Sequence, residues 1–257
     1  MSQAKPSPKK IAAEILARLE AGGDPVQAAG AHRYFREEVE FYGWTSSAVR
    51  ALTKEIHAGV RGTWILADAL ALAEILLREE KFEAKSAGIL LLLQFKKEFT
   101  PAVFRTIKSW LAKDYCANWA SVDTLCPEGL GGLIERHPDL ADEILGWTTH
   151  RGRWVQRGSI VAFVSLARHG KFLDQAYRVA EAMLGTDDDL LQKAAGWMLR
   201  EAGKTDMPRL RGFLLKHGPR IPRTSLRYAI EKFPPDERKA LLLATKPNPR
   251  PKAKRGS

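Results

Sequence analysis

The side chains best suited to chemistry are Trp119 and Asp123, in the segment Asn118-Trp-Ala-Ser-Val-Asp123. They lie four residues apart, so on a helix they share a face and the carboxylate follows the indole by one turn. Alone, such a pair is more typical of a core tryptophan and a capping aspartate than of a site. Its meaning therefore depends on the elements that position it.

Other catalytic signatures are missing from the sequence. Cys116 and Cys126 have neither CxxC nor metal-ligand spacing, and the six histidines form no HxxxH or HExxH pair. There is no phosphate loop, nucleotide fingerprint or nucleophile-base arrangement. We therefore expect no metal, no cofactor and no disulfide.

The composition is that of a globular protein. Of 257 residues, 45% are hydrophobic and 28% charged, which is ordinary for a soluble chain. The longest apolar run, Ile89 to Leu93, is too short to span a bilayer. We predict no membrane segment, a cytoplasmic or nucleoid-associated location and a monomer.

The net charge of +11 is unevenly distributed along the chain. Residues 11–150 hold 15 bases and 20 acids, whereas residues 151–233 hold 16 bases and 8 acids, and residues 246–257 add five bases. A basic half is typical of a protein that binds nucleic acid, because phosphates attract it and release counterions. A solvated face with a solubilising tail is an equally good interpretation of charge alone.

The apolar pattern predicts helices throughout. Ser7 caps a helix over Pro8 to Ala21, a second runs from about Pro25 to Glu38, and Thr45 or Ser46 caps a third over Ala48 to Ala58. The amino-terminal NH groups of this third helix could hold a phosphate. Further helices follow from Thr63, with breaks expected at Gly129, His137-Pro138, Gly152, Gly170, Gly185, Gly203, Gly218-Pro219 and Phe233-Pro234-Pro235. We predict an all-α fold.

The helices repeat with a regular period. Aligning four of them places Lys85, Arg157, Lys193 and Arg227 in one column, at separations of 72, 36 and 34. A period near 36 with two helices per unit is the signature of an α-solenoid. The sequence thus predicts one repeat domain, residues 10–245, between disordered ends at 1–9 and 246–257, with a stripe of bases along it.

One acid interrupts this stripe. In the repeat between Lys85 and Arg157, a strict count of 36 places Ser121 in the basic column, whereas a slip of two residues places Asp123 there, at separations of 38 and 34. We favour the slip, because it keeps Cys126 and Leu130 in the buried phase. A carboxylate facing a polyanion opposes binding, so its presence there suggests chemistry. A structural salt bridge with Arg157 is the alternative.

A single carboxylate limits the reaction. Glycosidic cleavage normally requires two carboxylates, one of which protonates the leaving group. An N-alkylated purine in DNA already carries a positive charge and leaves without a proton, so one carboxylate suffices to stabilise the oxocarbenium ion on the sugar. Indole faces favour the cation through cation-π contact.

With these pieces in order, the sequence resembles the AlkD-like DNA alkylation repair glycosylases over roughly residues 10–245. The matching fragments are Tyr34 nine residues before Gly43, the Trp-x-x-x-Asp of Trp119 and Asp123, Trp154-Val-Gln-Arg157, and Leu191-Gln-Lys-Ala-Ala-Gly-Trp197-Met-Leu-Arg200-Glu. The resemblance implies HEAT-like repeats that form a concave, basic cleft for double-stranded DNA. It also implies removal of N3- and N7-alkylpurines without flipping the base into a pocket.

The resemblance also implies roles for individual residues. Asp123 is the catalytic carboxylate, and Trp119 and Trp197 cradle the sugar of the lesion. The contacts with DNA that it implies are Tyr34 and Arg157, with Arg200 and Lys204 as further phosphate contacts. Thr45 and Ser46, at the start of a helix, and Lys193, in the basic column, are expected DNA contacts from the residue pattern.

One departure from the family pattern leaves a different function open. Ala120 follows Trp119 where many relatives have a polar or acidic residue. A non-catalytic HEAT-like module that binds DNA or a protein partner is therefore the alternative, followed by a plain scaffold. The remaining tryptophans are expected to be packing residues, namely Trp44, Trp64, Trp110, Trp147 and Trp154.

Overall fold

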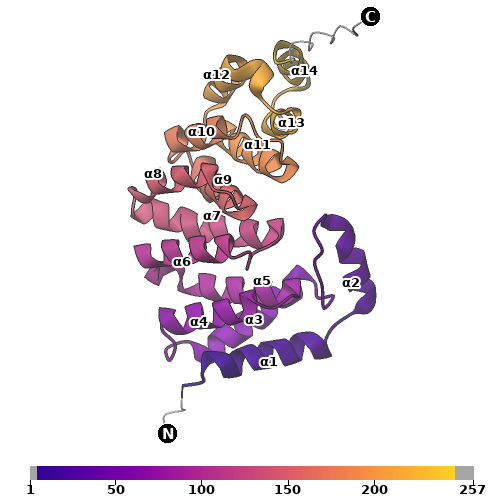
Figure 1. Ribbon diagram of the computed structural model, residues 1–257, viewed down its shortest axis with the longest axis vertical. Helices are drawn as coiled ribbons and strands as arrows, with labels where there is room; N and C mark the ends of the chain where they lie inside the picture. Colours follow the sequence, from indigo (N-terminus) through magenta and orange to yellow (C-terminus); the bar gives the residue numbers. More distant parts are fainter. Residues whose placement is uncertain (1–4, 247–257) are drawn as a thin grey trace, which may run out of the picture. The chain divides into compact units, whose positions relative to one another are not determined.

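The computed structural model describes residues 5–246, which form an array of helices (Figure 1). These residues contain fourteen α-helices and four short 3-10 helices, and their one β-interaction is a parallel bridge between Glu40 and Lys81. None of these helices is long and apolar enough to cross a membrane. The all-α prediction is confirmed, while most of the two predicted disordered ends lies outside the described residues.

The chain divides after Ala162 into two compact units, and the predicted single repeat domain spans both. Unit 1 holds α1 (Pro8–Ala21), α2 (Pro25–Ala31), η1 (His32–Tyr34), α3 (Ser46–Val60), α4 (Leu66–Leu77), α5 (Phe82–Leu92), η2 (Leu93–Glu98), α6 (Pro101–Ala112), α7 (Trp119–Arg136), α8 (Leu140–Leu145) and η3 (Gly146–Thr149). The division falls within α9 (Arg153–Arg168). Unit 2 continues with α10 (Leu173–Ala182), α11 (Asp189–Gly203), α12 (Met207–His217), η4 (Gly218–Arg220), α13 (Arg223–Ala229) and α14 (Pro235–Ala244).

Local signals set the first helix as predicted. The Ser7 hydroxyl accepts a hydrogen bond from the Lys10 amide at 3.3 Å, and Pro8 occupies the first turn, where its missing NH costs nothing. Buried Ile11, Ile15 and Leu19 form the inner face. The bounds Pro8–Ala21 are confirmed.

The second predicted helix was too long. It ends at Ala31, continues as η1 to Tyr34 and does not reach Glu38. Helix α2 buries no residue and lies apart from the helical layers of unit 1 (Figure 1). The chain leaves the helix because Phe35 packs against rings of other elements, a tertiary contact that local periodicity does not reveal.

The predicted break at Gly129 was wrong as well. Helix α7 runs through Gly129 and through Pro127. The missing side chain of Gly129 makes room for Ile107, whose Cδ1 atom lies 3.3 Å from where a Cβ would stand. Pro127 has no NH for the carbonyl of Asp123, four residues earlier. The helix continues because its flanking residues are buried on neighbouring helices.

The repeat period is visible in the helices. Lys85 is the fourth residue of α5, and Asp123, Arg157, Lys193 and Arg227 are each the fifth residue of α7, α9, α11 and α13. The column therefore falls on alternate helices, with one helix between successive members. This is the pattern of a repeat with two helices per unit.

The column is not a stripe of free bases, however. The Lys85 ammonium donates to the carbonyls of Leu77 at 2.7 Å and Tyr115 at 3.0 Å, and burial lowers its pKa. Lys193 pairs with Asp189 at 2.8 Å. Lys85 thus ties the end of α4 to the turn after α6, a structural role that the sequence alignment did not indicate.

In unit 2, α11 and α13 approach closely at Gly196. A Cβ at this glycine would lie 2.5 Å from the Ser225 carbonyl oxygen and 2.5 Å from the Tyr228 Cβ. Backbone cannot yield as a flexible side chain does. The contact therefore requires glycine beside Trp197.

We predict that Gly196→Ala lowers the free energy of unfolding by up to about 2 kcal/mol. Overpacking usually costs about 1–3 kcal/mol, and alanine gains only roughly 1 kcal/mol over glycine in a helix. The control is Gly212→Ala in α12, where nothing lies within 4 Å of the added Cβ, and which should stabilise by about 0.5–1 kcal/mol. Urea unfolding measures both, and equal effects would contradict the close contact.

Candidate functional site

The site is organised on the first turns of α7. The Asn118 side chain caps this helix by accepting a hydrogen bond from the Ser121 amide at 2.8 Å, so Trp119 is its first residue. Asp123 follows one turn later. Trp119 is partly exposed, while Val122, Leu125 and the cap are buried. The helix thus buries one face and presents the indole at its start.

Asp123 forms a bidentate ion pair with Arg157. The guanidinium Nε donates to Oδ1 at 2.9 Å, and Nη2 donates to Oδ2 at 2.7 Å. The Asp123 side chain is 15% exposed and the Arg157 side chain is 5% exposed. Burial raises the pKa of the Asp123 carboxyl, and the charge and hydrogen bonds of Arg157 act in the opposite direction. The pair fixes both carboxylate oxygens, as the salt-bridge alternative anticipated.

Gly158, the residue after Arg157, lies where α9 packs against α6 and α7. A Cβ on Gly158 would lie 2.8 Å from Leu111 Cδ1 of α6 and 3.5 Å from Cys126 Sγ of α7. Both neighbours are fully buried. The glycine therefore leaves room for the Leu111 side chain next to the ion pair.

The ring that stacks on Trp119 is Phe35. Their centroids are 5.3 Å apart with planes 23° from parallel. Phe35 also packs against Phe41 at 5.4 Å and Phe82 at 5.6 Å. Tyr34, the aromatic residue expected near the site, is 68% exposed and has the Arg33 guanidinium over its ring. The sequence pointed to Tyr34, whereas the ring that contacts Trp119 belongs to the next residue, Phe35.

Glu83 holds the segment that follows these rings. This buried carboxylate accepts hydrogen bonds from the amides of Tyr42, Gly43 and Trp44, at 3.0, 2.8 and 3.0 Å. The Phe82 amide, one residue before, donates to the Glu40 carbonyl at 2.8 Å. The start of α5 therefore anchors the chain from Glu40 to Trp44.

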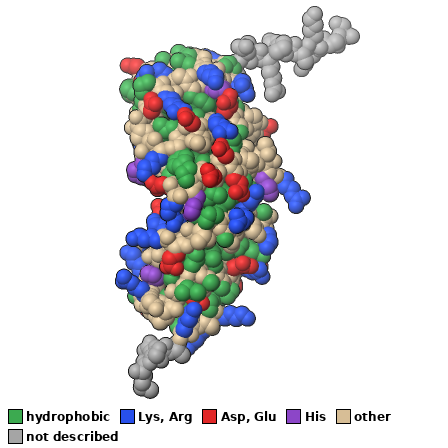
Figure 2. Space-filling view, turned by 90° about the vertical axis from the view of Figure 1, so that its left-hand side faces the viewer, with side chains coloured by type: hydrophobic (Ala, Val, Ile, Leu, Met, Phe, Trp, Pro, Cys, Tyr) green, Lys and Arg blue, Asp and Glu red, His purple; other side chains and the backbone are tan. Residues whose placement is uncertain are grey.

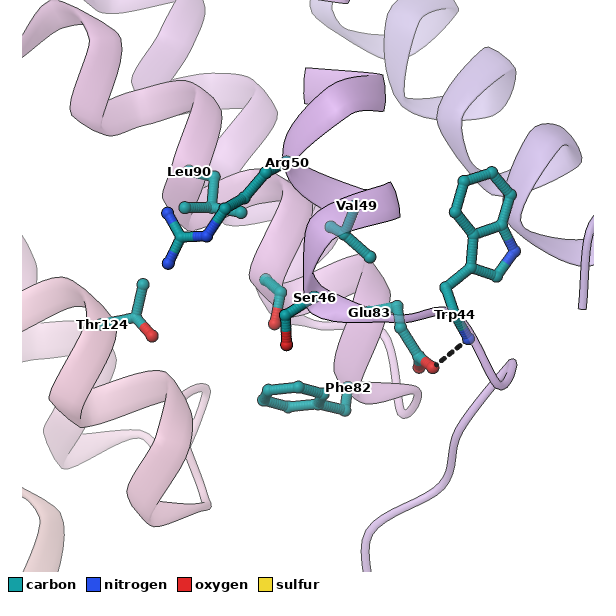
Figure 3. Close-up of a pocket in the computed structure, with 9 residues that line it drawn as sticks. Trp44, Ser46, Val49, Arg50, Phe82, Glu83, Leu90 and Thr124 are labelled. Atoms are coloured by element: carbon teal, nitrogen blue, oxygen red, sulfur yellow. Dashed lines mark hydrogen bonds between the residues drawn. The ribbon is translucent and has the colours of Figure 1, made fainter. Parts of the chain in front are cut away.

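A pocket lies between α3, α5 and α7, and Thr124, the residue after Asp123, lines it (Figure 3). Arg50 from α3 and Thr124 from α7 face each other across it, with Ser46 between α3 and the ring of Phe82. Arg50 is exposed, and no carboxylate pairs with it among residues 5–246. The sequence reasoning missed Arg50, although it lies four residues after Ser46 and so on the same helix face.

The amino-terminal end of α3 borders the same pocket. The Thr45 hydroxyl caps the helix by accepting from the Ala48 amide at 3.2 Å, as predicted, and α3 extends to Val60, two residues beyond the expected end. Ser46 is exposed at the first position. The pocket therefore combines hydroxyl groups, a guanidinium and a helix amino terminus, all of which can donate to an anion.

Unit 2 holds the other expected site residues. Trp197 in α11 is partly exposed. Arg200 pairs with Glu231 and lies 3.6 Å from Glu201, and Lys204 lies 2.6 Å from Glu201. Both bases thus have carboxylate partners within their own unit. A bound phosphate would have to compete with these partners.

The charge on the visible surface is mixed. Figure 2 shows one face, on which Lys and Arg side chains are interspersed with Asp and Glu. The concave basic cleft stays a prediction.

Four of the five tryptophans expected to be packing residues are 7% exposed or less, namely Trp64, Trp110, Trp147 and Trp154.

We predict that Arg157→Met destabilises the protein, because it leaves the Asp123 carboxylate buried without its partner. Breaking one side of such a pair typically costs about 3–5 kcal/mol. The double variant Asp123→Asn with Arg157→Met should regain part of this loss in urea unfolding. A change below about 0.5 kcal/mol in the single variant would show that the pair is dispensable.

Comparison with known proteins shows the family and the fold of the chain. The family model for DNA alkylation repair enzymes matches residues 15–233, whereas no curated protein matches the chain. A solved structure from Enterococcus faecalis, described as a predicted DNA alkylation repair enzyme, aligns with a TM-score of 0.73 at 20% identity, over 83% of this chain and 97% of that chain. This likeness shows the fold alone. Because the family model covers most of the sequence, the protein belongs to the DNA alkylation repair enzyme family.

Proposed function

We propose that this protein is a monofunctional DNA glycosylase that removes positively charged N3- and N7-alkylated purines from duplex DNA. The observation that carries the proposal is the carboxylate of Asp123, held by two hydrogen bonds from Arg157, one helical turn after a partly exposed indole. Membership of the family supports a role in DNA repair.

In the proposed reaction, the bond between the anomeric carbon and the base nitrogen breaks, and the cationic base leaves as a neutral molecule. Positive charge then develops on the deoxyribose, where the Asp123 carboxylate stabilises it and orients the attacking water. The water oxygen bonds to the anomeric carbon and loses a proton to solvent, which leaves the hydroxyl of an abasic sugar. Since the leaving group needs no proton, a second carboxylate is unnecessary. The reaction needs neither a cofactor nor flipping of the base into a pocket.

Arg157 acts through Asp123 in this proposal. Its side chain is 5% exposed, so its fork is better placed to orient the carboxylate than to hold the DNA backbone, the role first expected for it. Two parallel hydrogen bonds fix the plane of the carboxylate as well as its position. We therefore assign Arg157 as a positioning residue.

The aromatic side chains are proposed to contact the lesion and its sugar. An indole face attracts a cation by roughly 0.5–2 kcal/mol, more where water is excluded. We propose this role for Trp119 and Trp197. Tyr34 is well exposed and is proposed to contact the DNA from the amino-terminal segment.

Phosphate contacts are proposed from both units. The pocket between α3, α5 and α7 offers Arg50 and Ser46, and Thr45 caps the start of the same helix α3. In unit 2, the proposed contacts are Lys193, Arg200 and Lys204, which would exchange their carboxylate partners for phosphates. Such contacts release counterions, so binding should weaken as salt increases.

A second candidate function follows from the ion pair itself. A bidentate pair with both side chains at 15% exposure or less is also typical of a structural salt bridge. On that interpretation, the protein is a non-catalytic HEAT-like module that binds DNA or a protein partner. Removing the charge of Asp123 distinguishes the two functions.

We predict that Asp123→Asn slows release of N7-methylguanine roughly a hundredfold to a thousandfold, the usual effect of losing a transition-state contact. DNA affinity should be unchanged or higher, because a negative charge is removed near phosphates. Single-turnover release from a duplex with one lesion measures the rate. The control is Glu128→Gln, an exposed carboxylate on the same helix, and a wild-type rate in Asp123→Asn would contradict the assignment.

The pH dependence provides an independent prediction. Only the ionised carboxylate stabilises the developing cation, so the rate should rise with pH through the pKa of Asp123. Burial raises this pKa, so the acid limb should lie above the value of about 3.9 for a free aspartate. Arg157→Lys, which keeps the charge but loses the fork, should move the limb to still higher pH. A limb at the same pH in both proteins would argue against ionisation of Asp123 as its cause.

A further inference from the structure

A cavity lies in unit 2 between α10 and α12. Its volume is about 520 Å³, which is within the usual range for a small-molecule site. All of its lining residues belong to these two helices. The column residues of unit 2, Lys193 and Arg227, belong to α11 and α13. The cavity is therefore built from helices that carry no member of the column.

Two deeply buried side chains at this cavity each carry a polar atom without a partner. Tyr177 and His217 are 7% and 4% exposed, and neither the Tyr177 hydroxyl nor the His217 Nε2 atom has a hydrogen-bond partner among residues 5–246. A Glu181 oxygen lies 3.8 Å from Nε2, which is too long for a hydrogen bond. Such atoms cost free energy on folding. Two of them at one cavity indicate a ligand that supplies the partner.

Both side chains can donate a hydrogen bond to such a ligand. Burial raises the pKa of Tyr177 to about 12, and it lowers the pKa of His217. The phenol therefore keeps its proton at neutral pH, and the neutral imidazole has one N–H. A phosphate, which offers several acceptor oxygens, can accept from both groups.

The charges around the cavity also suit an anion. Lys216 is exposed, and no carboxylate pairs with it in the described part of the chain. Arg209 pairs with Asp174 at 2.5 Å, but the Asp174 side chain is 81% exposed, so a phosphate can replace this weak partner. With Arg178 and Glu181, the lining holds three bases and two acids.

Phe213 gives the cavity an aromatic wall. Its ring lies against those of Tyr177 and His217, with centroids 5.1 and 4.5 Å away, and the residue is partly exposed. A phosphate alone would leave most of the cavity empty, whereas a flat ring can pack against Phe213. The lining therefore fits a ligand that combines a phosphate with a ring.

We propose that this cavity binds a free nucleoside monophosphate, with its phosphate on Tyr177, His217 and Lys216 and its base against Phe213. Both buried polar atoms are covered by their neighbours, so side chains at the rim must shift as the phosphate enters. Lys216 and Arg209 have long, flexible stems that allow this shift. The site is independent of the proposed glycosylase reaction, because it contains none of the residues assigned to that reaction.

The test is isothermal titration calorimetry of the full chain with adenosine 5′-monophosphate (AMP). We expect one AMP per chain with a dissociation constant on the order of 10–100 μM, typical for a ligand of this size. Adenosine alone and inorganic phosphate alone should each bind at least about tenfold more weakly. No binding of AMP at about 1 mM, or equally tight binding of inorganic phosphate, would overturn the proposal.

Tyr177→Phe separates ligand binding from folding. It should weaken AMP binding at least about tenfold, because a hydrogen bond to a charged group is lost. The melting temperature should be unchanged or higher, since the hydroxyl has no partner within the described residues. Unchanged AMP affinity, or a melting temperature lower by more than about 3 °C, would contradict the assignment of this hydroxyl to a ligand.

Lys216→Ala and Lys239→Ala form a matched pair of variants. Both lysines are exposed residues of unit 2, but Lys239 belongs to α14 and does not line the cavity. Lys216→Ala should weaken AMP binding about threefold to tenfold, and Lys239→Ala should leave it unchanged. Equal effects would mean that AMP is held by net charge alone, which overturns the proposal.

A last titration distinguishes a free nucleotide from the phosphates of DNA. AMP affinity should be the same in the presence of a saturating undamaged duplex. Loss of AMP binding under these conditions would make the cavity a DNA contact and overturn the proposal. Protein that binds AMP but releases no alkylated base would overturn the glycosylase function alone, and active protein that binds no AMP would overturn this inference alone.

Discussion

The buried ion pair between Asp123 and Arg157 is the interaction on which the rest of the site depends. A carboxylate in this setting must be paired, because taking an isolated charge out of water is costly. The pair therefore requires α9 to lie close to α7. Gly158, the residue after Arg157, leaves room there for Leu111 of α6, and Cys126 of α7 lies at ordinary contact distance from it.

The same pairing affects the chemistry in two opposing ways. Burial raises the pKa of the Asp123 carboxyl and the guanidinium opposes that rise, but the guanidinium also neutralises part of the charge that a developing cation would meet. The balance favours chemistry only if the remaining lone pairs face the sugar. Orientation is therefore as important at this site as charge.

Much of the fold could be predicted because its signals are local. The cap at Ser7 and the apolar spacing of α1 lie within a few residues, and the repeat period places Asp123 and Arg157 at matching positions on alternate helices. That spacing also indicates a salt bridge between Asp123 and Arg157 as an alternative to a catalytic role. The function of Lys85 was not predictable, because the carbonyls that it binds belong to α4 and a turn after α6. Phe35 was missed because its partners lie 47 and 84 residues away.

The segment from Asp24 to Gly43 contains Phe35, and the hydrogen bond from the Asp24 amide to the Tyr42 carbonyl joins its ends. This arrangement has an evolutionary consequence. Helix α2 buries no side chain, so its surface can accept many substitutions without disturbing the packing of unit 1. Gly43, only twelve residues after Ala31, can accept none, because any side chain would collide with the backbone at Asp24. Mutational tolerance is therefore expected to change abruptly within this short stretch. Related proteins could vary the exposed residues of α2 while all keeping glycine at position 43.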